Sequence, residues 1–420
     1  MTMSDAATDQ FEPRSQVLRT LIERGYVNQA TSLAGMDTAF RAGVVPAYVG
    51  FDATADSLHV GHLMPIMTLR RLQQAGHKPI VLIGGGTTRI GDPSFRADAR
   101  PMLTDEQIAA NIAGIRKVFE RLLHFGDGPA DAILVNNADW LDRVGWIDML
   151  RDVGRHFSIS RMLSFDSVKS RLEKQENLTF LEFNYMILQA LDFLELSRRA
   201  DCRLQMGGAD QWGNIINGVE LIRRMDGKQA FGMTAPLLTT ASGAKMGKTA
   251  AGAVWLNADR LSPYDYWQFW RNTEDADVVR FLKLFTDLPM AEIEQLAGAT
   301  GSELNALKQR LADEATALVH GAGAARRAEA TARQAFGQHG AAEGLPTLEL
   351  SHVEHGREIA LVDLMVRARL TASKGEARRA ISGCGVKLNG NVVQDVDLVV
   401  SPRALPIRIS FGRRRHVVVK

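Results

Sequence analysis

Two histidines, His59 and His62, flank Gly61 in the sequence HVGH, between an expected strand and an expected helix. Imidazole donors, backbone N–H groups and the positive end of a helix dipole would then surround one point, which favours binding of a phosphate chain. No glutamate at the HExxH spacing and no cysteine accompanies the pair, so the segment does not indicate a zinc site. An incidental HxGH sequence is the alternative interpretation.

A second candidate is a polar line on an otherwise apolar helix, expected over residues 182–196. Apolar side chains occur nearly all round this helix, which predicts that it is buried. Tyr185, Gln189 and Asp192 nevertheless fall at i, i+4 and i+7 on one face. Burying an aspartate is costly unless it meets a partner or a ligand. We therefore expect this face to bind a small polar ligand, with an internal hydrogen-bond network as the alternative.

A glycine-rich segment at 84–94 follows an apolar stretch and contains Asp92 near its end. It does not match a P-loop, because Asp92 and Pro93 stand where lysine and serine or threonine are required. A carboxylate at the ligand-facing end of a strand most simply recognises an ammonium or hydroxyl group. The alternative is a turn aspartate before proline.

Two later segments combine glycines with charged or polar side chains. In 207–214 (GGADQWGN), two glycines allow close backbone approach before Asp210, which could bind ribose hydroxyls. Lys245 and Lys248 lie three apart in a loop that could close over an anion. A solvated surface loop is the alternative for this lysine pair.

The elements that must position these residues alternate between strand and helix. Short apolar runs predict buried strands, and amphipathic runs between them predict helices, so we expect a doubly wound parallel α/β sheet with ligands at the carboxyl ends of its strands. A lead helix is expected over 14–31, and a wholly helical region over 262–334. The expected strands are 47–51, 79–84 and 132–135, and the expected helices are 63–75, 104–123, 144–152, 180–196 and one after residue 213.

Composition limits the class of protein. The chain has 420 residues, 45% hydrophobic and 23% charged, which is ordinary for a globular protein of two or three domains. It has two cysteines, too few for a disulfide framework, and no apolar run long enough for a membrane helix. Residues 1–10 lack the basic and apolar regions of a signal peptide. We expect a soluble, cytoplasmic protein that does not bind a membrane.

The charge is uneven along the chain. Residues 351–420 carry 13 Lys and Arg against 6 Asp and Glu, whereas the whole chain has a net charge of +2. A basic module on a mildly acidic body is typical of a polyanion-binding unit, with a solubilising tail as the alternative. We expect a catalytic domain over 1–261, a helical domain over 262–338, a linker over 339–350 and a small basic domain over 351–420.

Taken together and in this order, these segments resemble the class I aminoacyl-tRNA synthetases, and the bacterial tyrosyl-tRNA synthetase family in particular. Residues 59–62 are similar to the first signature of the class and residues 245–249 to its KMSKS-type second signature. Segments 48–52, 91–94 and 207–214, with the polar face of 185–192, match blocks particular to the tyrosine enzymes. The tail resembles a small α+β RNA-binding fold shared with a ribosomal protein, and the resemblance implies a Rossmann-like catalytic domain.

The resemblance also implies roles for individual residues. The phenol hydroxyl would be bound by Tyr48 and Asp192, and the ammonium by Asp92, Tyr185 and Gln189. The tyrosine site would contain Tyr48, Asp92, Tyr185, Gln189, Asp192 and Gln211. The ATP site and the catalytic groups would comprise Gly50, Asp52, Thr54, His59, Gly61, His62, Arg96, Arg100, Gly208, Asp210, Lys245 and Lys248. The tRNA would be bound by Lys374, Arg378, Arg379, Lys387, Arg413, Arg414 and Arg415.

The implied reaction joins L-tyrosine to ATP, giving tyrosyl-adenylate and pyrophosphate, and then transfers tyrosine to the terminal adenosine of tRNA(Tyr). ATP would enter with Mg²⁺, with no tightly bound cofactor and no protein metal site, and the family implies a homodimer. A tryptophan-specific sister enzyme is one alternative, opposed by Tyr48 and Asp192, because an indole N–H needs only an acceptor. A non-catalytic RNA-binding relative is the other, opposed by the histidine and lysine pairs.

Overall fold

The computed structural model describes residues 11–92, 102–243, 246–249, 252–336, 345–350, 358–401, 405–412 and 415–420. The chain divides into two compact units. One comprises Met1–Met246 with Val279–Ala297, and the other comprises Gly247–Val278 with Gly298–Lys420. Among the described residues, no helix combines the length and apolarity that crossing a membrane requires.

The first unit is built around one six-stranded sheet, in the order β1-β6-β5-β2-β3-β4. Strands β2 to β6 pair in parallel, and the short edge strand β1 pairs antiparallel with β6. From β2 the chain adds β3 and β4 on one side and later β5 and β6 on the other, so the strand order reverses between β2 and β5. The strands are β1 (Gln29–Ala30), β2 (Pro46–Phe51), β3 (Lys78–Ile83), β4 (Ile133–Asn136), β5 (Leu204–Gly208) and β6 (Phe231–Ala235).

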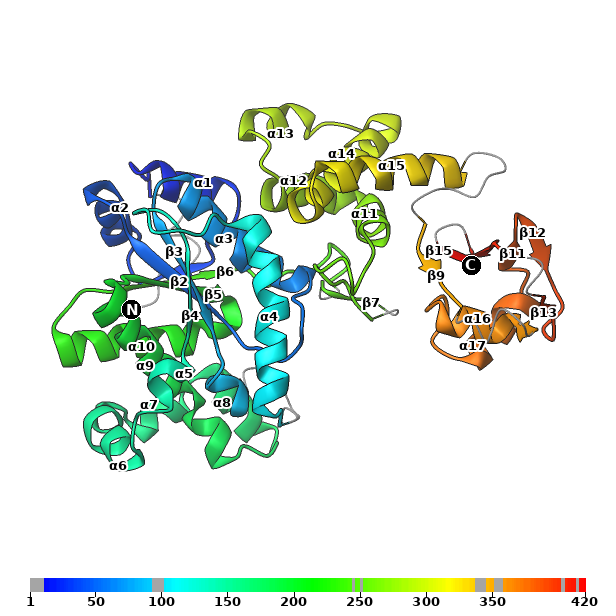
Figure 1. Cartoon of the computed structure of the whole chain (residues 1–420). Helices are drawn as coiled ribbons and strands as arrows, with labels where there is room; N and C mark the ends of the chain where they lie inside the picture. The colour runs from blue at the N-terminus through cyan, green and yellow to red at the C-terminus, as the bar shows by residue number, and fades with distance from the viewer. Residues whose placement is uncertain are drawn as a thin grey trace. The chain divides into compact units, whose positions relative to one another are not determined.

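Helices cover both faces of this sheet (Figure 1). Alternate side chains of the central strands, Tyr48, Ile80 and Leu82, point into a core formed with helices α9 and α10. On the opposite face α3 packs against β2 and β3, and the ring of Phe51 lies 4.9 Å from that of Phe119 on α4. The helices that sandwich the sheet are α3 (Leu63–Gln74), α4 (Asp105–Leu122), α9 (Phe180–Ala200) and α10 (Trp212–Asp226). The expected parallel sheet alternating with helices is therefore confirmed.

One expected element is wrong in its second half. The lead helix predicted over 14–31 is α1 (Gln16–Glu23), which ends before Gly25 at φ 84°. A φ in this left-handed region is adopted most easily by glycine, and it turns the chain out of the helix. Strand β1 follows, and its pairing with β6 could not be inferred from the apolar spacing. The next helix is α2 (Leu33–Ala42).

Helix α9 has clear end signals. Thr179 and Glu182 form a reciprocal capping box, and Asp201 ends the helix in a left-handed conformation at φ 47°. Arg171 forms a buried ion pair with Glu182 at 3.0 Å, which ties the first turn to α8. The short helices before it are α5 (Ala138–Leu141), α6 (Trp146–Asp148), α7 (Ile159–Leu163) and α8 (Asp166–Glu173).

The second unit contains a helical region and a small C-terminal module. The helical prediction for 262–334 is confirmed by α11 (Pro263–Arg271), α12 (Val278–Phe285), α13 (Met290–Leu296), α14 (Gly301–His320) and α15 (Ala322–Phe336), of which most of α12 and all of α13 belong to the first unit. Two short strands, β7 (Lys248–Thr249) and β8 (Gly252–Ala253), pair before them.

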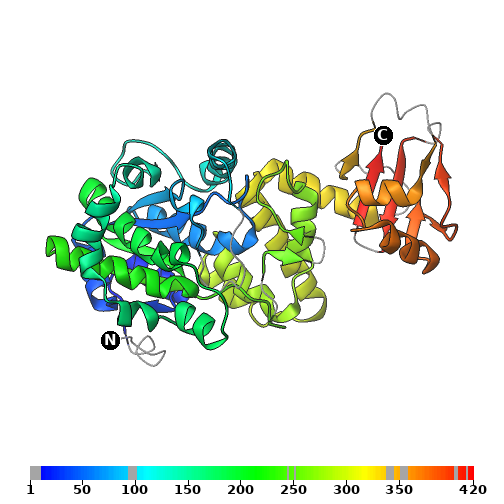
Figure 2. The same cartoon turned by 90° about the horizontal axis from the view of Figure 1, so that it is seen from below.

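In the C-terminal module two helices pack on a five-stranded sheet of order β12-β11-β14-β15-β9, as Figure 2 shows in orange and red. Leu361, Leu364, Ile381 and Ile409 are among its fully buried core residues. Its elements are β9 (Thr347–Leu348), β10 (Ile359–Ala360), α16 (Leu361–Arg367), α17 (Lys374–Ser382), β11 (Val386–Leu388), β12 (Asn391–Val393), β13 (Val399–Val400), β14 (Ile407–Phe411) and β15 (Arg415–Val419).

Candidate active site

A cavity of about 620 Å³ lies in the first unit, at the carboxyl ends of β2 and β5. This is the point where the strand order reverses, which is where doubly wound sheets bind ligands. The cavity brings together residues that lie far apart in the sequence, from Tyr48 to Met246. Its lining includes the following predicted site residues: Tyr48, Gly50, Asp52, Thr54, His59, Gly61, His62, Asp92, Tyr185, Gln189, Asp192, Gly208, Asp210 and Gln211.

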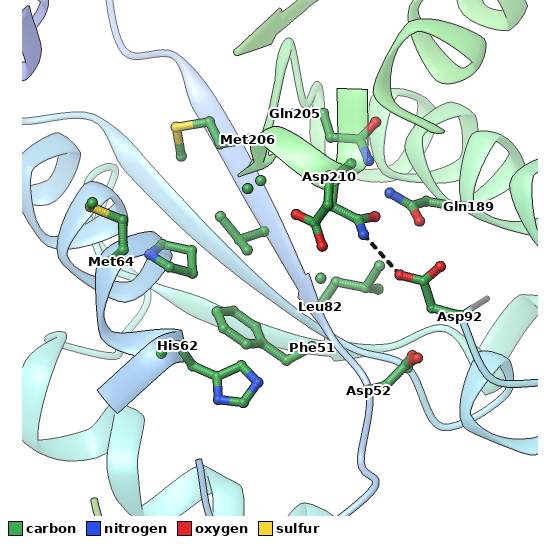
Figure 3. Close-up of a pocket in the computed structure, with 18 of the residues that line it drawn as sticks. Phe51, Asp52, His62, Met64, Leu82, Asp92, Gln189, Gln205, Met206 and Asp210 are labelled. Atoms are coloured by element: carbon green, nitrogen blue, oxygen red, sulfur yellow. Dashed lines mark hydrogen bonds between the residues drawn. The ribbon is translucent and has the colours of Figure 1, made fainter. Parts of the chain in front are cut away.

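The side chains divide between two sides of the cavity. In Figure 3, His62 lies on one side, whereas Asp92, Gln189 and Asp210 lie on the other.

For several predicted site residues the structure does not describe the side chain. Lys245, Arg96, Arg100, Arg413 and Arg414 lie outside the described residues, and Lys248 lies on β7 with its side chain undescribed.

The two histidines are held by backbone groups. His59 precedes a short 3-10 turn, Val60–His62, and its Nδ1 accepts the Gly61 N–H at 3.1 Å. The Nδ1 atom of His62 accepts the His59 N–H at 3.2 Å, and the two ring centroids are 4.0 Å apart. A Cβ on Gly61 would lie 2.8 Å from a carbon of the His59 ring. Glycine is therefore required for this arrangement, which fixes both rings at the start of α3.

Hydrogen bonds and close packing hold the loop of residues 52–58 in place. The Ala53 N–H donates to Thr88 Oγ1 and the Ala53 carbonyl accepts from Asn111 Nδ2, both at 2.8 Å. Helix α4 approaches the loop so closely that a Cβ on Gly114 would lie 2.0 Å from the Asp56 carbonyl oxygen. These contacts hold the segment that carries Thr54 and leads into the histidine pair.

Asp192 is a buried carboxyl group of the site. Its side chain is 2% exposed, and its two oxygens accept hydrogen bonds from Asn137 Nδ2 at 2.9 Å and Trp140 Nε1 at 2.8 Å. Burial raises the pKa of Asp192 to about 7, although the two hydrogen bonds act in the opposite direction. A carboxylate with two bonds still has lone pairs for a further donor. The predicted line of Tyr185, Gln189 and Asp192 thus does face a cavity.

Tyr48 stands beside this carboxyl group. Its ring is buried and lies 5.3 Å from that of Phe193. Its hydroxyl is buried and has no hydrogen-bond partner within the described residues. Burial, followed by the negative charge of Asp192, raises the pKa of Tyr48 well above its usual value, so the group is a neutral O–H donor. A buried hydroxyl without a partner costs free energy, and a ligand that accepted its hydrogen bond would remove that cost.

A hydrogen-bond network joins Asp192 to the loop after β2. Asn137 Nδ2 also donates to Thr87 Oγ1 at 3.0 Å, and Thr87 donates to Asp52 at 3.0 Å. The Tyr185 hydroxyl lies 3.3 Å from the same Asp52 carboxyl group. The polar face of α9 therefore contributes both to the cavity and to buried hydrogen bonds. The alternative interpretation of this face, an internal hydrogen-bond network, is thus also partly correct.

A second hydrogen-bond network supports the lining of the same cavity. Gln211 Nε2 donates to Asp92 Oδ2 at 2.8 Å, the bond drawn as a dashed line in Figure 3. Asn214 Nδ2 donates to the side-chain oxygens of both Gln189 and Gln211 at 3.1 Å. Gln205 also lines the cavity from β5, with a buried oxygen that lacks a partner among the described residues.

Sequence reasoning missed the residues that support the predicted ones. Asn137 and Trp140 follow the end of β4, and this position at the carboxyl end of a parallel strand was a usable signal. Thr87 lies in the glycine-rich segment already singled out, and Asn214 in the GGADQWGN block. Gln205 had no signal, because a glutamine within an apolar strand has no characteristic spacing.

The basic residues of the C-terminal module differ in their surroundings. Lys374, Arg378, Arg379 and Lys387 are exposed, the first three on α17 and the last on β11. Lys374 forms an ion pair with Asp363 at 2.6 Å. Arg415 donates to the Leu370 carbonyl at 3.0 Å and is partly buried, so it contributes to packing of the module.

Fold and site define the class: an α/β protein with a histidine pair at a helix start and a ligand cavity at the switch point of its sheet. A family model for class I tRNA synthetases (W and Y) matches residues 42–337, and one for the tyrosine–tRNA ligase SYY-like C-terminal domain matches residues 338–406. The chain therefore belongs to the class I tRNA synthetases of the W and Y family.

Individual relatives point within that family to the tyrosine enzymes. The chain is 56% identical over 412 residues to the tyrosine–tRNA ligase of Dinoroseobacter shibae, covering 98% of this chain and 99% of the relative. It is 59% identical over 407 residues to that of Zymomonas mobilis subsp. mobilis, covering 97% and 98%. Among solved structures, a C-terminally truncated mitochondrial tyrosyl-tRNA synthetase of Aspergillus nidulans aligns with a TM-score of 0.69 and 30% identity, over 79% of this chain and 97% of that one.

Proposed function

We propose that this chain is a tyrosine–tRNA ligase. It activates L-tyrosine with ATP to give tyrosyl-adenylate and pyrophosphate, and it then transfers tyrosine to the terminal adenosine of tRNA(Tyr). The observation that carries the proposal is the buried pair of Tyr48 and Asp192 in the lining of the cavity. A cytoplasmic location remains part of the proposal.

The phenol of tyrosine fits this pair in hydrogen-bond polarity. Its O–H donates to the Asp192 carboxylate, and its oxygen accepts from the Tyr48 hydroxyl, whose partner is otherwise missing among the described residues. Phenylalanine would enter the same apolar walls but leave both groups buried without that partner, which is costly. Tryptophan offers an N–H donor and no acceptor for Tyr48. The ammonium of the substrate is bound by Asp92, Tyr185 and Gln189.

In activation, the tyrosine carboxylate attacks the α-phosphorus of ATP and pyrophosphate leaves. A carboxylate is already a nucleophile, so no general base is needed, and catalysis comes from orientation and from stabilisation of the charge on the phosphates. ATP enters with Mg²⁺ as its counter-ion. Tyrosine's carboxyl region is oriented by Gln211 and the ribose by Asp210. The groups assigned to ATP are Gly50, Asp52, Thr54, His59, Gly61, His62, Arg96, Arg100, Gly208, Lys245 and Lys248.

The tRNA is assigned to the C-terminal parts of the chain. The catalytic domain extends over 1–261, a tRNA-interacting helical domain over 262–338 and, after a linker at 339–350, a basic domain over 351–420. Support comes from the exposed cations of α17 and β11, which suit contact with a phosphate backbone. The proposed contacts are Lys374, Arg378, Arg379, Lys387, Arg413, Arg414 and Arg415.

The chain is also proposed to form a homodimer. Exposed apolar side chains gather on the segment from α6 to the start of α9, and the rings of Trp146 and Phe180 lie 6.2 Å apart across it. A patch of this kind is typical of an association surface. Trp146→Glu with Phe180→Glu should convert the dimer to a monomer in sedimentation velocity. A monomeric unmodified chain would contradict the proposal. The exposed side chains are Trp146, Ile147, Leu150, Ile159, Leu163, Leu172, Phe180 and Leu181.

The test of the main proposal is ATP–pyrophosphate exchange on the purified chain without tRNA, with tyrosine, tryptophan or phenylalanine. We expect exchange with tyrosine alone. Exchange with tryptophan would overturn the assignment of Tyr48 and Asp192. Absence of exchange with every amino acid, together with binding of tRNA, would favour a non-catalytic RNA-binding protein.

A further inference from the structure

Asn214 lies behind the polar wall of the cavity and does not line it. It belongs to the first turn of α10 and is 8% exposed. Its Nδ2 group donates to two side-chain oxygens, Gln189 Oε1 and Gln211 Oε1, each at 3.1 Å. Both glutamines do line the cavity. One buried amide therefore holds two ligand-facing amides at the same time.

The direction of every bond in this network follows from Asp92. A carboxylate accepts hydrogen bonds, so Gln211 must turn its N–H toward Asp92, at 2.8 Å, and its oxygen toward Asn214. Asn214 must then present its N–H groups, and these fix the oxygen of Gln189 as the next acceptor. The polarity set at Asp92 is passed on through Gln211 and Asn214 to Gln189.

We infer that Asn214 is a positioning residue for tyrosine, because it fixes which atom Gln189 presents and supports Gln211 in the orientation that Asp92 sets. This inference rests on the proposed function, in which Asp92 and Gln189 accept from the substrate ammonium and Gln211 orients its carboxyl region. An amide that has lost its partner can rotate by 180° and exchange oxygen for nitrogen at nearly constant shape. A reversed Gln189 would turn its N–H groups toward the substrate ammonium, whereas Gln211 would be held by Asp92 alone.

Two substitutions separate a role in polarity from a role in packing. Asn214→Ala removes both bonds and leaves a small void, whereas Asn214→Asp keeps the shape but offers acceptors where donors are required. Facing a carboxylate, both glutamines would turn their N–H groups toward it, and the Gln211 oxygen would then oppose Asp92. We expect KM for tyrosine to rise about tenfold in Asn214→Ala and about a hundredfold in Asn214→Asp, with KM for ATP unchanged. A packing role predicts the opposite order, because the aspartate is the better fit in shape.

The matched control is Asn217, one turn further along α10. It is 5% exposed, and its Nδ2 has no partner within the described residues. Asn217→Ala should leave KM for tyrosine as in the unmodified chain. Thermal unfolding of all variants, measured beside the exchange kinetics and tyrosine binding by calorimetry, identifies any loss of folded protein.

The outcomes distinguish the inference from the function on which it rests. One outcome overturns the positioning role and leaves the proposed function standing. In that outcome the unmodified chain binds tyrosine, and Asn214→Asp binds tyrosine at least as tightly as Asn214→Ala does. If the unmodified chain binds no tyrosine, the proposed function fails and the positioning role fails with it.

Discussion

The two ends of the cavity are held in different ways. At the end proposed to bind the phenol, here called the phenol end, the buried groups are held by other side chains: Asp192 accepts from Asn137 and Trp140, and Tyr48 is buried beside it. At the end proposed to bind ATP, the histidine rings are held by backbone N–H groups, and a glycine makes room for them. Recognition of a small neutral hydroxyl needs desolvated groups of fixed polarity, whereas a charged phosphate chain can be bound by backbone dipoles and mobile cations. The phenol end should therefore be the more sensitive to single changes.

The largest effect is expected for Asp192→Asn. An amide can accept from only one of Asn137 and Trp140, so one buried donor is left facing another donor, and the phenol loses its acceptor. We expect kcat/KM for tyrosine in pyrophosphate exchange to fall by about 10³-fold, equivalent to about 4 kcal/mol. A fall of less than tenfold would contradict the importance assigned to this carboxylate. Circular dichroism and thermal unfolding check that the variant is folded.

His59→Ala should have the next largest effect. The substitution removes a group proposed to face the ATP phosphates and leaves the phenol end unchanged, so we expect kcat for activation to fall about 10²-fold while the dissociation constant for tyrosine stays the same. Pre-steady-state fluorescence with tyrosine and ATP separates the two quantities. An equal loss in tyrosine binding would show that the two ends are not independent.

The pH dependence sharpens the comparison further. The pKa of Asp192 is raised to about 7, and the phenol O–H needs the ionised carboxylate. The ionised fraction rises about tenfold from pH 6 to pH 8, so the affinity of the chain for tyrosine should rise by that factor and then level off. Calorimetric titration at fixed ionic strength measures it. A flat profile would contradict the raised pKa.

The same pKa shift predicts a change in stability of defined sign. The native aspartate keeps its proton up to about pH 7, whereas an unfolded aspartate loses it near pH ~4, so the native state binds the extra proton between these values. Relative to Asp192→Asn, the free energy of unfolding should fall as the pH rises through this window. Urea unfolding at pH 5 and pH 8 tests the sign, and an increase with pH would refute it.

The smallest effect is expected for Tyr48→Phe. This substitution should increase the stability of the chain while weakening its discrimination of tyrosine from phenylalanine. The hydroxyl is buried without a partner among the described residues, so its removal should raise the free energy of unfolding by about 1 kcal/mol. Discrimination of tyrosine from phenylalanine should fall, because one of the two groups left unsatisfied by phenylalanine is gone. Denaturant unfolding and exchange with both amino acids measure the two quantities.

Much of the site could be predicted, because its residues follow local rules. The i, i+4, i+7 spacing of Tyr185, Gln189 and Asp192 determines a shared helix face, and the HVGH segment stands at a strand-to-helix junction. Apolar runs identified β2, β3 and β4, but β5 and β6 were not assigned. Glycines weaken the strand signal in both: Gly207 and Gly208 at the carboxyl end of β5, and Gly232 near the start of β6.

The sequence by itself determined the alternation of helices with β2, β3 and β4 and the family of the chain, because periodicity and motif spacing are local properties. The tertiary structure decided which partner each buried polar group meets. Asp192 meets Trp140 from 52 positions away, and Gln211 meets Asp92 from 119 positions away. These contacts exist because β5 lies beside β2, with α9 and α10 packed on one face. Only that arrangement makes Asn214 and Asn137 supports of the site, since their bonds depend on distances that no local pattern encodes.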